Sequence, residues 1–390
     1  MTHSPEQRHA PLRSPRSMFH VKHRNHQGLR RTATLALLAL ATLLLAGCGR
    51  IAGPEGWAAP VADGDLLFVQ IERGTISAGT LSEAGNFTQR WHFPTDDDDI
   101  DFKGIYAAPI VDDGIIYIAA FDGSVLALDI ESGRPLWPTP LDIGSHIVAT
   151  PAFDQDFLYV ATEKGEVVIV HRDIGTEANR YFEGNGRIWS QPIVIGDTLY
   201  LGEFDGRKLA SIDLGTGTVL WSQPLGGAVS ANLALAGGRI IAAALDHSLH
   251  AYNIGSTPTE AWIFEADGWL VANPLPVGDT IYIASLNGSV YAVDTATGSQ
   301  QWQFNEPGLE FRAQPALIGS MLVVADRRGS LRGLDVSTGE QRWERDLNEA
   351  DLLADPLIRG TQLLYITRDG ELIQVDPADG TVVREKDGEA

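Results

Sequence analysis

Two groups of side chains in this sequence have the residue types that bind metal ions. Asp96–Asp99 and Asp101 form an acidic cluster, and clustered carboxylates can bind Ca²⁺. The cluster lacks the alternating spacing and the glycine of a calcium loop, so a solvated acidic loop is the favoured interpretation. His247 and His250 lie around an expected hairpin and do not form the i, i+4 pair of a zinc-binding helix. The sequence therefore predicts no metal site.

The residue types and spacings of known catalytic motifs are also missing. We find no Gly-x-Ser-x-Gly elbow, no phosphate-binding loop and no paired nucleophile and base. The formal net charge is −22, and residues 48–390 alone hold 22 bases and 50 acids. Such a surface should repel nucleic acid. We therefore expect a protein that is not an enzyme, carries no cofactor and binds no nucleic acid.

Cys48 is the only cysteine, which excludes an intrachain disulfide framework. It follows the basic pair Arg30-Arg31 and an uncharged, mostly apolar run from Thr32 to Leu45. This run is shorter than the ~20 residues of a membrane-spanning helix and is typical of a secretory signal. Leu45-Ala46-Gly47-Cys48 resembles the bacterial lipobox, in which the cysteine is acylated and becomes the mature N-terminus.

The resemblance predicts an exported lipoprotein that is membrane-anchored at Cys48 and faces the periplasm or the cell exterior. Residues 1–47 would be an N-terminal extension with the signal peptide, and residues 48–56 a short linker. An ordinary signal peptide with a chance cysteine is the alternative. Met18 could be the true start, and Arg30-Arg31 could mark twin-arginine export instead of a generic basic region.

An internal repeat of ~41 residues sets the positions of the secondary-structure elements in this sequence. A fixed period of this length is typical of repeat architectures. A small residue stands two positions before a proline in seven units, and the remaining unit has Leu233 in place of proline. The units are Ala58/Pro60, Ala107/Pro109, Ala149/Pro151, Ser190/Pro192, Ala231/Leu233, Ala272/Pro274, Ala313/Pro315 and Ala354/Pro356. The acidic cluster falls in the one longer spacing and is therefore an insertion between the first two units.

Two further landmarks recur in each unit. A turn follows the proline position by thirteen residues, and in seven of eight units its second residue is glycine, which adopts a positive φ without steric cost. An aspartate, a glycine and a tryptophan then follow in four units, as in Asp294, Gly298 and Trp302, and weaker copies of this landmark stand in the other four. We expect the aspartate to cap the turn and the tryptophan to pack between units.

Short β-strands are predicted between these landmarks, for example at 115–118, 198–201, 280–283 and 363–366. Four strands per unit in eight units predict an all-β protein, an eight-bladed β-propeller of four-stranded antiparallel blades over residues 57–390. The segment Ala292–Trp302 also resembles the repeat of pyrroloquinoline-quinone (PQQ) proteins. Eight such blades behind a lipobox are similar to the lipoproteins of outer-membrane protein assembly.

The resemblance implies a non-enzymatic scaffold whose partners are envelope proteins. A β-barrel assembly complex is one candidate partner. The residues that break the repeat are the candidates for partner binding, because the periodic residues are needed for packing. Trp189, Trp269, Phe311 and Arg312 are such residues beside the loops between blades. Packing at the channel mouth is the structural alternative. A PQQ-dependent dehydrogenase and a cell-surface sensor or polysaccharide-binding propeller are the alternative functions.

Overall fold

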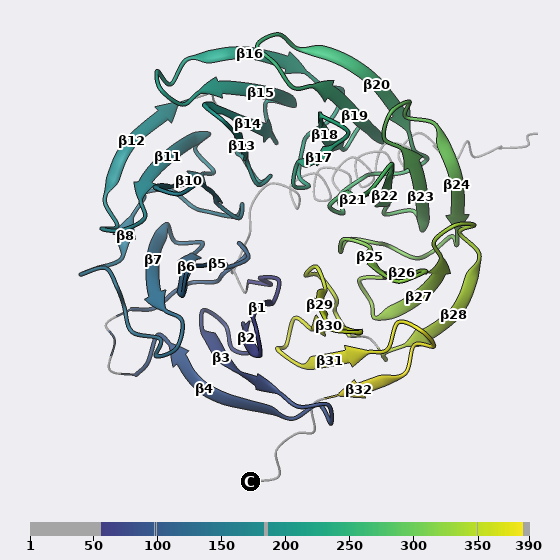
Figure 1. Cartoon of the computed structure of the whole chain (residues 1–390), viewed down its shortest axis with the longest axis horizontal. Coiled ribbons are helices and arrows are strands. Elements are labelled where there is room, and N and C mark those ends of the chain that lie inside the picture. The colour runs from purple at the N-terminus through teal and green to yellow at the C-terminus, as the bar shows by residue number, and fades with distance from the viewer. Residues whose placement is uncertain (1–55, 97, 99, 183–185, 349, 385–390) are drawn as a thin grey trace, which may run out of the picture. The chain divides into compact units, whose positions relative to one another are not determined.

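Thirty-two strands form eight antiparallel sheets of four, so the sequence-based prediction of an eight-bladed propeller is confirmed. The computed structural model describes residues 56–384 except 97, 99, 183–185 and 349. Residues 1–55, with Cys48 and the expected signal peptide, lie outside the described residues. Within the compact unit Pro54–Ala390, the blades follow one another in chain order around a central axis (Figure 1).

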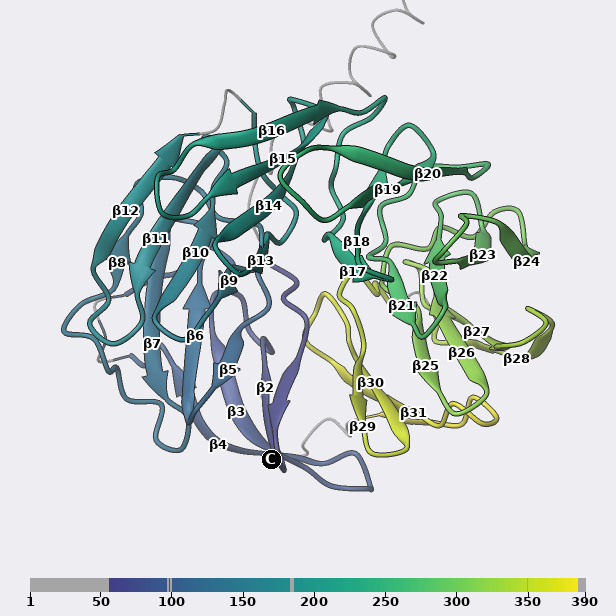
Figure 2. The same cartoon turned by 45° about the horizontal axis from the view of Figure 1, so that its top comes forward.

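Each blade consists of four consecutive strands, numbered from the axis outward (Figure 2). The first four blades comprise β1 (Val61–Asp63), β2 (Leu66–Val69), β3 (Ile76–Leu81) and β4 (Phe87–Phe93); β5 (Ile110–Asp112), β6 (Ile115–Ala119), β7 (Ser124–Asp129) and β8 (Leu141–Asp142); β9 (Ala152–Phe153), β10 (Phe157–Ala161), β11 (Glu166–His171) and β12 (Glu177–Phe182); and β13 (Ile193–Ile195), β14 (Thr198–Glu203), β15 (Lys208–Asp213) and β16 (Val219–Pro224). The last four comprise β17 (Ala234–Ala236), β18 (Arg239–Ala244), β19 (Ser248–Asn253) and β20 (Thr259–Glu265); β21 (Leu275–Val277), β22 (Thr280–Ala284), β23 (Ser289–Asp294) and β24 (Gln300–Asn305); β25 (Ala316–Ile318), β26 (Met321–Ala325), β27 (Ser330–Asp335) and β28 (Gln341–Asp346); and β29 (Leu357–Arg359), β30 (Gln362–Ile366), β31 (Leu372–Val375) and β32 (Val382–Arg384).

Alternate turns of a blade lie on opposite faces of the ring, because the four strands form a meander. The amide of Phe204, in the middle hairpin of the fourth blade, donates to the carbonyl of Arg187 in the loop between blades at 2.8 Å. The first and third turns of the same blade are joined by the bond from Leu214 N to Asp197 O, also 2.8 Å. We call the face with the middle hairpins and the loops between blades the inter-blade face, and the other the opposite face.

Neighbouring blades are joined by the tryptophans of the repeat, as predicted. Each indole N–H donates to a backbone carbonyl in the next blade at 2.8–3.1 Å. The pairs are Trp91–Ile130, Trp137–Arg172, Trp221–Gly255, Trp262–Thr295, Trp302–Val336 and Trp343–Pro377. In the third blade, the hydroxyl of Tyr181 donates to Leu214 O instead. These residues are therefore structural.

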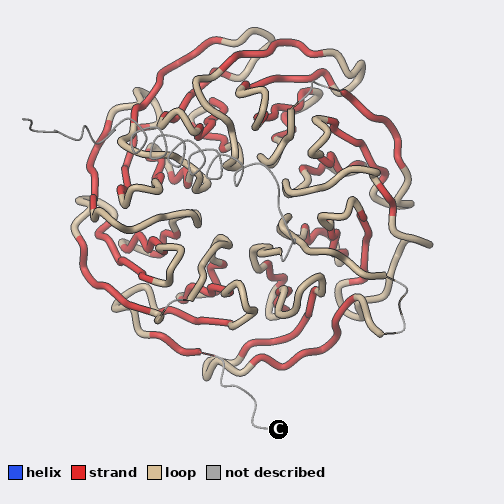
Figure 3. The backbone as a smooth tube through the Cα atoms, turned by 180° about the vertical axis from the view of Figure 1, so that it is seen from behind, coloured by secondary structure: helices blue, strands red, loops and turns tan. Residues whose placement is uncertain are grey.

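The ring closes without exchange of a strand, because the first and last blades are each complete. The last blade has Arg384 at the tryptophan position, and the seam is held by other contacts. Arg359 Nη1 donates to Leu81 O at 2.8 Å and Gln374 Nε2 donates to Ser82 O at 2.9 Å. Buried apolar side chains of both blades also form one cluster across the seam. Figure 3 shows the closed ring from behind.

One turn differs from the expectation drawn from the repeat. The glycine of the middle hairpin has a positive φ in six blades, and His247 takes this conformation at φ 70° in the fifth. In the fourth blade the positive φ is at Arg207 (49°) and not at Gly206. The reason is that Glu203 pairs with Lys208, which leaves a four-residue turn. The described part of the chain contains no helix long and apolar enough to cross a membrane.

Candidate functional site

The loops between blades are anchored by one buried residue each, four positions before the proline position. In seven blades this residue is apolar and 0% exposed: Ile105, Ile147, Ile188, Val229, Leu270, Phe311 and Leu352. The expectation that Phe311 contacts a partner is therefore wrong. Its side chain occupies this repeated core position, and we remove it from the candidate set.

Aromatic side chains from different blades meet on the inter-blade face. Trp57 contacts Tyr106 edge to face with ring centroids 4.5 Å apart, and Tyr106 contacts Phe121 in the same way at 5.4 Å. Phe121 stacks on His146 at 4.3 Å with 20° between the ring planes. Tyr106 and Phe121 are buried, whereas the His146 side chain is 55% exposed. Each such pair contributes ~0.5–1.5 kcal/mol beyond burial of area, so the row is held in place before any partner binds.

Glu163 continues this row into the fourth blade. One carboxylate oxygen lies 3.3 Å from His146 Nδ1, and the other accepts a 2.9 Å hydrogen bond from the indole of Trp189. Trp189 in turn packs on Phe204 with ring centroids 4.1 Å apart. We call Trp57, Tyr106, Phe121, His146, Trp189 and Phe204 the aromatic arc.

Arg187 covers the end of the aromatic arc. Its guanidinium lies 5.0 Å from the ring centre of Trp189 and 4.9 Å from that of Phe204. The same group binds both oxygens of Asp205, with Nε at 2.8 Å and Nη2 at 2.6 Å. The hydrogen bonds from Arg187 lower the pKa of Asp205 and raise that of Arg187. The pair therefore remains ionised and fixes the arginine over the rings.

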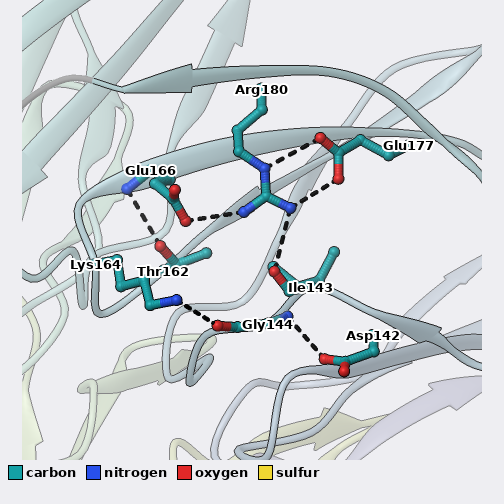
Figure 4. A network of polar contacts seen from close by, with 8 residues as sticks. All are labelled: Asp142, Ile143, Gly144, Thr162, Lys164, Glu166, Glu177 and Arg180. Atoms are coloured by element: carbon teal, nitrogen blue, oxygen red, sulfur yellow. Dashed lines mark hydrogen bonds and ion pairs between the residues drawn. The ribbon is translucent and has the colours of Figure 1, made fainter.

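The loop that carries His146 is fixed by a polar network between the second and third blades (Figure 4). Arg180 in β12 binds Glu166 Oε2 at 2.9 Å and Glu177 Oε2 at 2.7 Å, and it donates to the carbonyl of Ile143 at 3.2 Å. Lys164 Nζ donates to Gly144 O at 2.6 Å. Because Ile143 and Gly144 stand three and two positions before His146 in the same loop, these bonds restrict the stacked imidazole.

Of the four predicted partner residues, only Trp189 belongs to the aromatic arc. Trp269 lies in the loop after the fifth blade, is 55% exposed and has the ring of His247 6.5 Å away. Its loop is held by Asp267, which accepts hydrogen bonds from Asn287 Nδ2 and Gln303 Nε2. Arg312 is exposed on the loop after the sixth blade. The structure thus distributes the remaining candidates around the inter-blade face.

Trp57 and Tyr106 stand directly before the small residue of the repeat, as Trp189 does. The other five residues of the site were not predicted from the sequence: Phe121, Glu163, Phe204, Arg187 and His146. The first three stand directly before the middle-hairpin turn, where the other blades have Glu72, Leu245, Leu286 or arginine. This position varies between blades as much as the loops do, and that variation was the available signal.

The described residues contain no group of three or more histidine, cysteine, aspartate or glutamate side chains placed to hold a metal ion. In the acidic insertion, Thr95 N and Oγ1 both donate to Asp98 Oδ2, at 2.8 and 2.7 Å. Asp97 and Asp99 lie outside the described residues.

Comparison with known proteins agrees with the eight blades and with the repeat. The family described as "Outer membrane protein assembly factor BamB" matches residues 58–181, 205–348 and 286–389. The chain belongs to the BamB family. A solved structure of BamB from Moraxella catarrhalis superposes with a TM-score of 0.68 over 83% of this chain and 96% of that one, at 18% identity. This likeness establishes the fold.

Curated relatives match over shorter segments. BamB of Shewanella oneidensis is 23% identical over 170 residues, which are 40% of this chain and 40% of the relative. The quinohemoprotein alcohol dehydrogenase ADH IIB of Pseudomonas putida is 27% identical over 121 residues, 31% of this chain but 13% of the enzyme. The similarity to the enzyme thus covers a small part of its length.

Proposed function

We propose that this chain is exported, anchored in a membrane through acylated Cys48, and acts as a non-enzymatic scaffold. Its aromatic arc binds a protein partner in the assembly of outer-membrane proteins. Family membership supports the assembly role, since the BamB relatives carry that role in their name. The lipobox-like Leu45–Cys48 segment supports the anchor.

The aromatic arc is the observation that carries this proposal. Its residues are separate from the repeat tryptophans that join each blade to the next. The arc instead brings aromatic rings from four blades together on one face and adds an ion-paired arginine. Tryptophan, tyrosine and arginine dominate the energetics of protein interfaces. A rigid, preformed set of such residues also loses little entropy on binding.

The test is affinity capture from detergent-solubilised envelopes with full-length lipoprotein and variants. Trp189→Ala should reduce recovery of an outer-membrane assembly component ~30-fold or more, as expected of a residue worth ~2 kcal/mol or more. His146→Ala should also reduce recovery.

His171→Ala is the matched control, because His171 also packs on a phenylalanine, Phe157 at 5.0 Å, but belongs to β11 at its opposite-face end. Equal recovery by Trp189→Ala and wild-type protein would contradict the proposed site. Specific recovery of an unrelated protein would contradict the proposed process.

A further inference from the structure

The chain enters the ring on the inter-blade face. Gly56 stands at the position that is buried and apolar in the other seven blades. Its φ is +80°, and a Cβ there would lie 2.5 Å from the backbone of Ile105. Ala58 N donates to Ile105 O at 3.1 Å, and Trp57 packs on Tyr106. The first described residues are therefore fixed beside the aromatic arc.

The covalent distance from this point to Cys48 is short. Residues 49–55 separate Cys48 from Gly56. Eight Cα–Cα steps span at most ~29 Å whatever the conformation. A path from Gly56 over the outer edge of a blade to the opposite face must cross four strands, ~15 Å, and then the length of a six-residue strand, ~20 Å. The linker is too short for that path.

We propose that the inter-blade face is turned toward the membrane that holds the lipid anchor. The linker from Cys48 to Gly56 has eight Cα–Cα steps and reaches at most ~30 Å. The aromatic arc therefore binds the part of a membrane-embedded partner that lies within ~30 Å of the lipid headgroups. This inference rests on the acylation of Cys48 in the proposed function. It specifies which face of the propeller is turned toward the membrane and how far the interaction surface lies from the headgroups.

The experiment uses acylated full-length lipoprotein in vesicles of phosphatidylcholine and phosphatidylglycerol with an acceptor dye on the headgroups. Because Cys48 is blocked by acylation, an introduced cysteine is the one free thiol and can carry a donor dye. Glu265→Cys places the dye at the inter-blade end of β20, and Asp197→Cys is the matched opposite-face variant. Energy transfer should be at least ~2-fold more efficient from Glu265→Cys, because a strand length separates the faces.

A second variant with twenty Gly/Ser residues inserted between Gly53 and Pro54 should reduce this difference. The root-mean-square length of the linker then rises from ~16 Å to ~30 Å. Equal transfer from both faces in acylated protein, or greater transfer from Asp197→Cys, would overturn the orientation and leave the partner site intact. Mass spectrometry that shows an unmodified Cys48 would overturn the anchor and the orientation together.

Discussion

The contact between Trp302 and Gly339 allows the joining of blades to be tested quantitatively. Gly339 has φ +73°, and a Cβ there would lie 2.5 Å from the Trp302 ring. Gly339→Ala thus combines a left-handed alanine, ~1–2 kcal/mol, with overpacking, ~1–3 kcal/mol. Gly360→Ala is the matched control, since Gly360 has φ +60° and nothing within 4 Å of the added carbon. We expect a loss of ~2–5 kcal/mol for Gly339→Ala and ~1–2 kcal/mol for Gly360→Ala.

Urea unfolding of the two variants, alone and in a Trp302→Ala background, separates the cost of the left-handed alanine from the cost of overpacking against the Trp302 ring. Trp302→Ala itself should cost ~3–5 kcal/mol. In its absence Gly339→Ala has no ring to collide with, so its cost should fall to that of Gly360→Ala. Equal costs of the two alanines in the wild-type background, or no change in the Trp302→Ala background, would refute the packing that we describe between blades.

Three further predictions concern the face and the seam. The hydrogen bonds from Arg187 lower the pKa of Asp205 from its ordinary 3.8, so this pair stabilises the fold above that pH and less as the pH falls through the lowered pKa. The difference in unfolding midpoint between wild type and Arg187→Gln should therefore shrink in acid, and an equal difference at neutral and acidic pH would argue against the ion pair. Gln374→Met removes the bond to Ser82 O at the ring seam and should cost ~1–3 kcal/mol, with faster amide exchange in the first and last blades; unchanged exchange there would exclude the seam contact. Trp269→Ala should change stability by less than ~0.5 kcal/mol because the side chain is exposed, and a larger loss on thermal unfolding would show a packing role.

The blade number, the strand order and the tryptophan contacts could be predicted from the sequence because each follows from the repeat. Burial of Phe311 follows from the same logic, since an apolar residue recurs four positions before the proline position in seven of the eight units. We selected Phe311 because its side chain is aromatic, but its position is the one that is buried and apolar in six of the other seven units.

The aromatic arc could not be predicted in the same way. His146 stacks on Phe121 only because the middle hairpin of one blade bonds to the next loop, and Trp189 reaches Glu163 across 26 residues. Contacts of this kind depend on how hairpins and loops of neighbouring blades meet in space. The shifted turn at Arg207 arose likewise from the pairing of Glu203 with Lys208, which encloses four residues where the fifth blade has three.

The central claim is that the inter-blade face binds an envelope partner through the aromatic arc. The most direct measurement is photocrosslinking in living cells, with benzoylphenylalanine placed at Arg207, which is exposed in the same middle hairpin as Phe204. The control position is Asp197 on the opposite face. We expect Arg207 to give a discrete adduct with an outer-membrane assembly component that Trp189→Ala abolishes, and Asp197 to give none. The same adduct from both positions, or a discrete adduct from Asp197 alone, would contradict the claim.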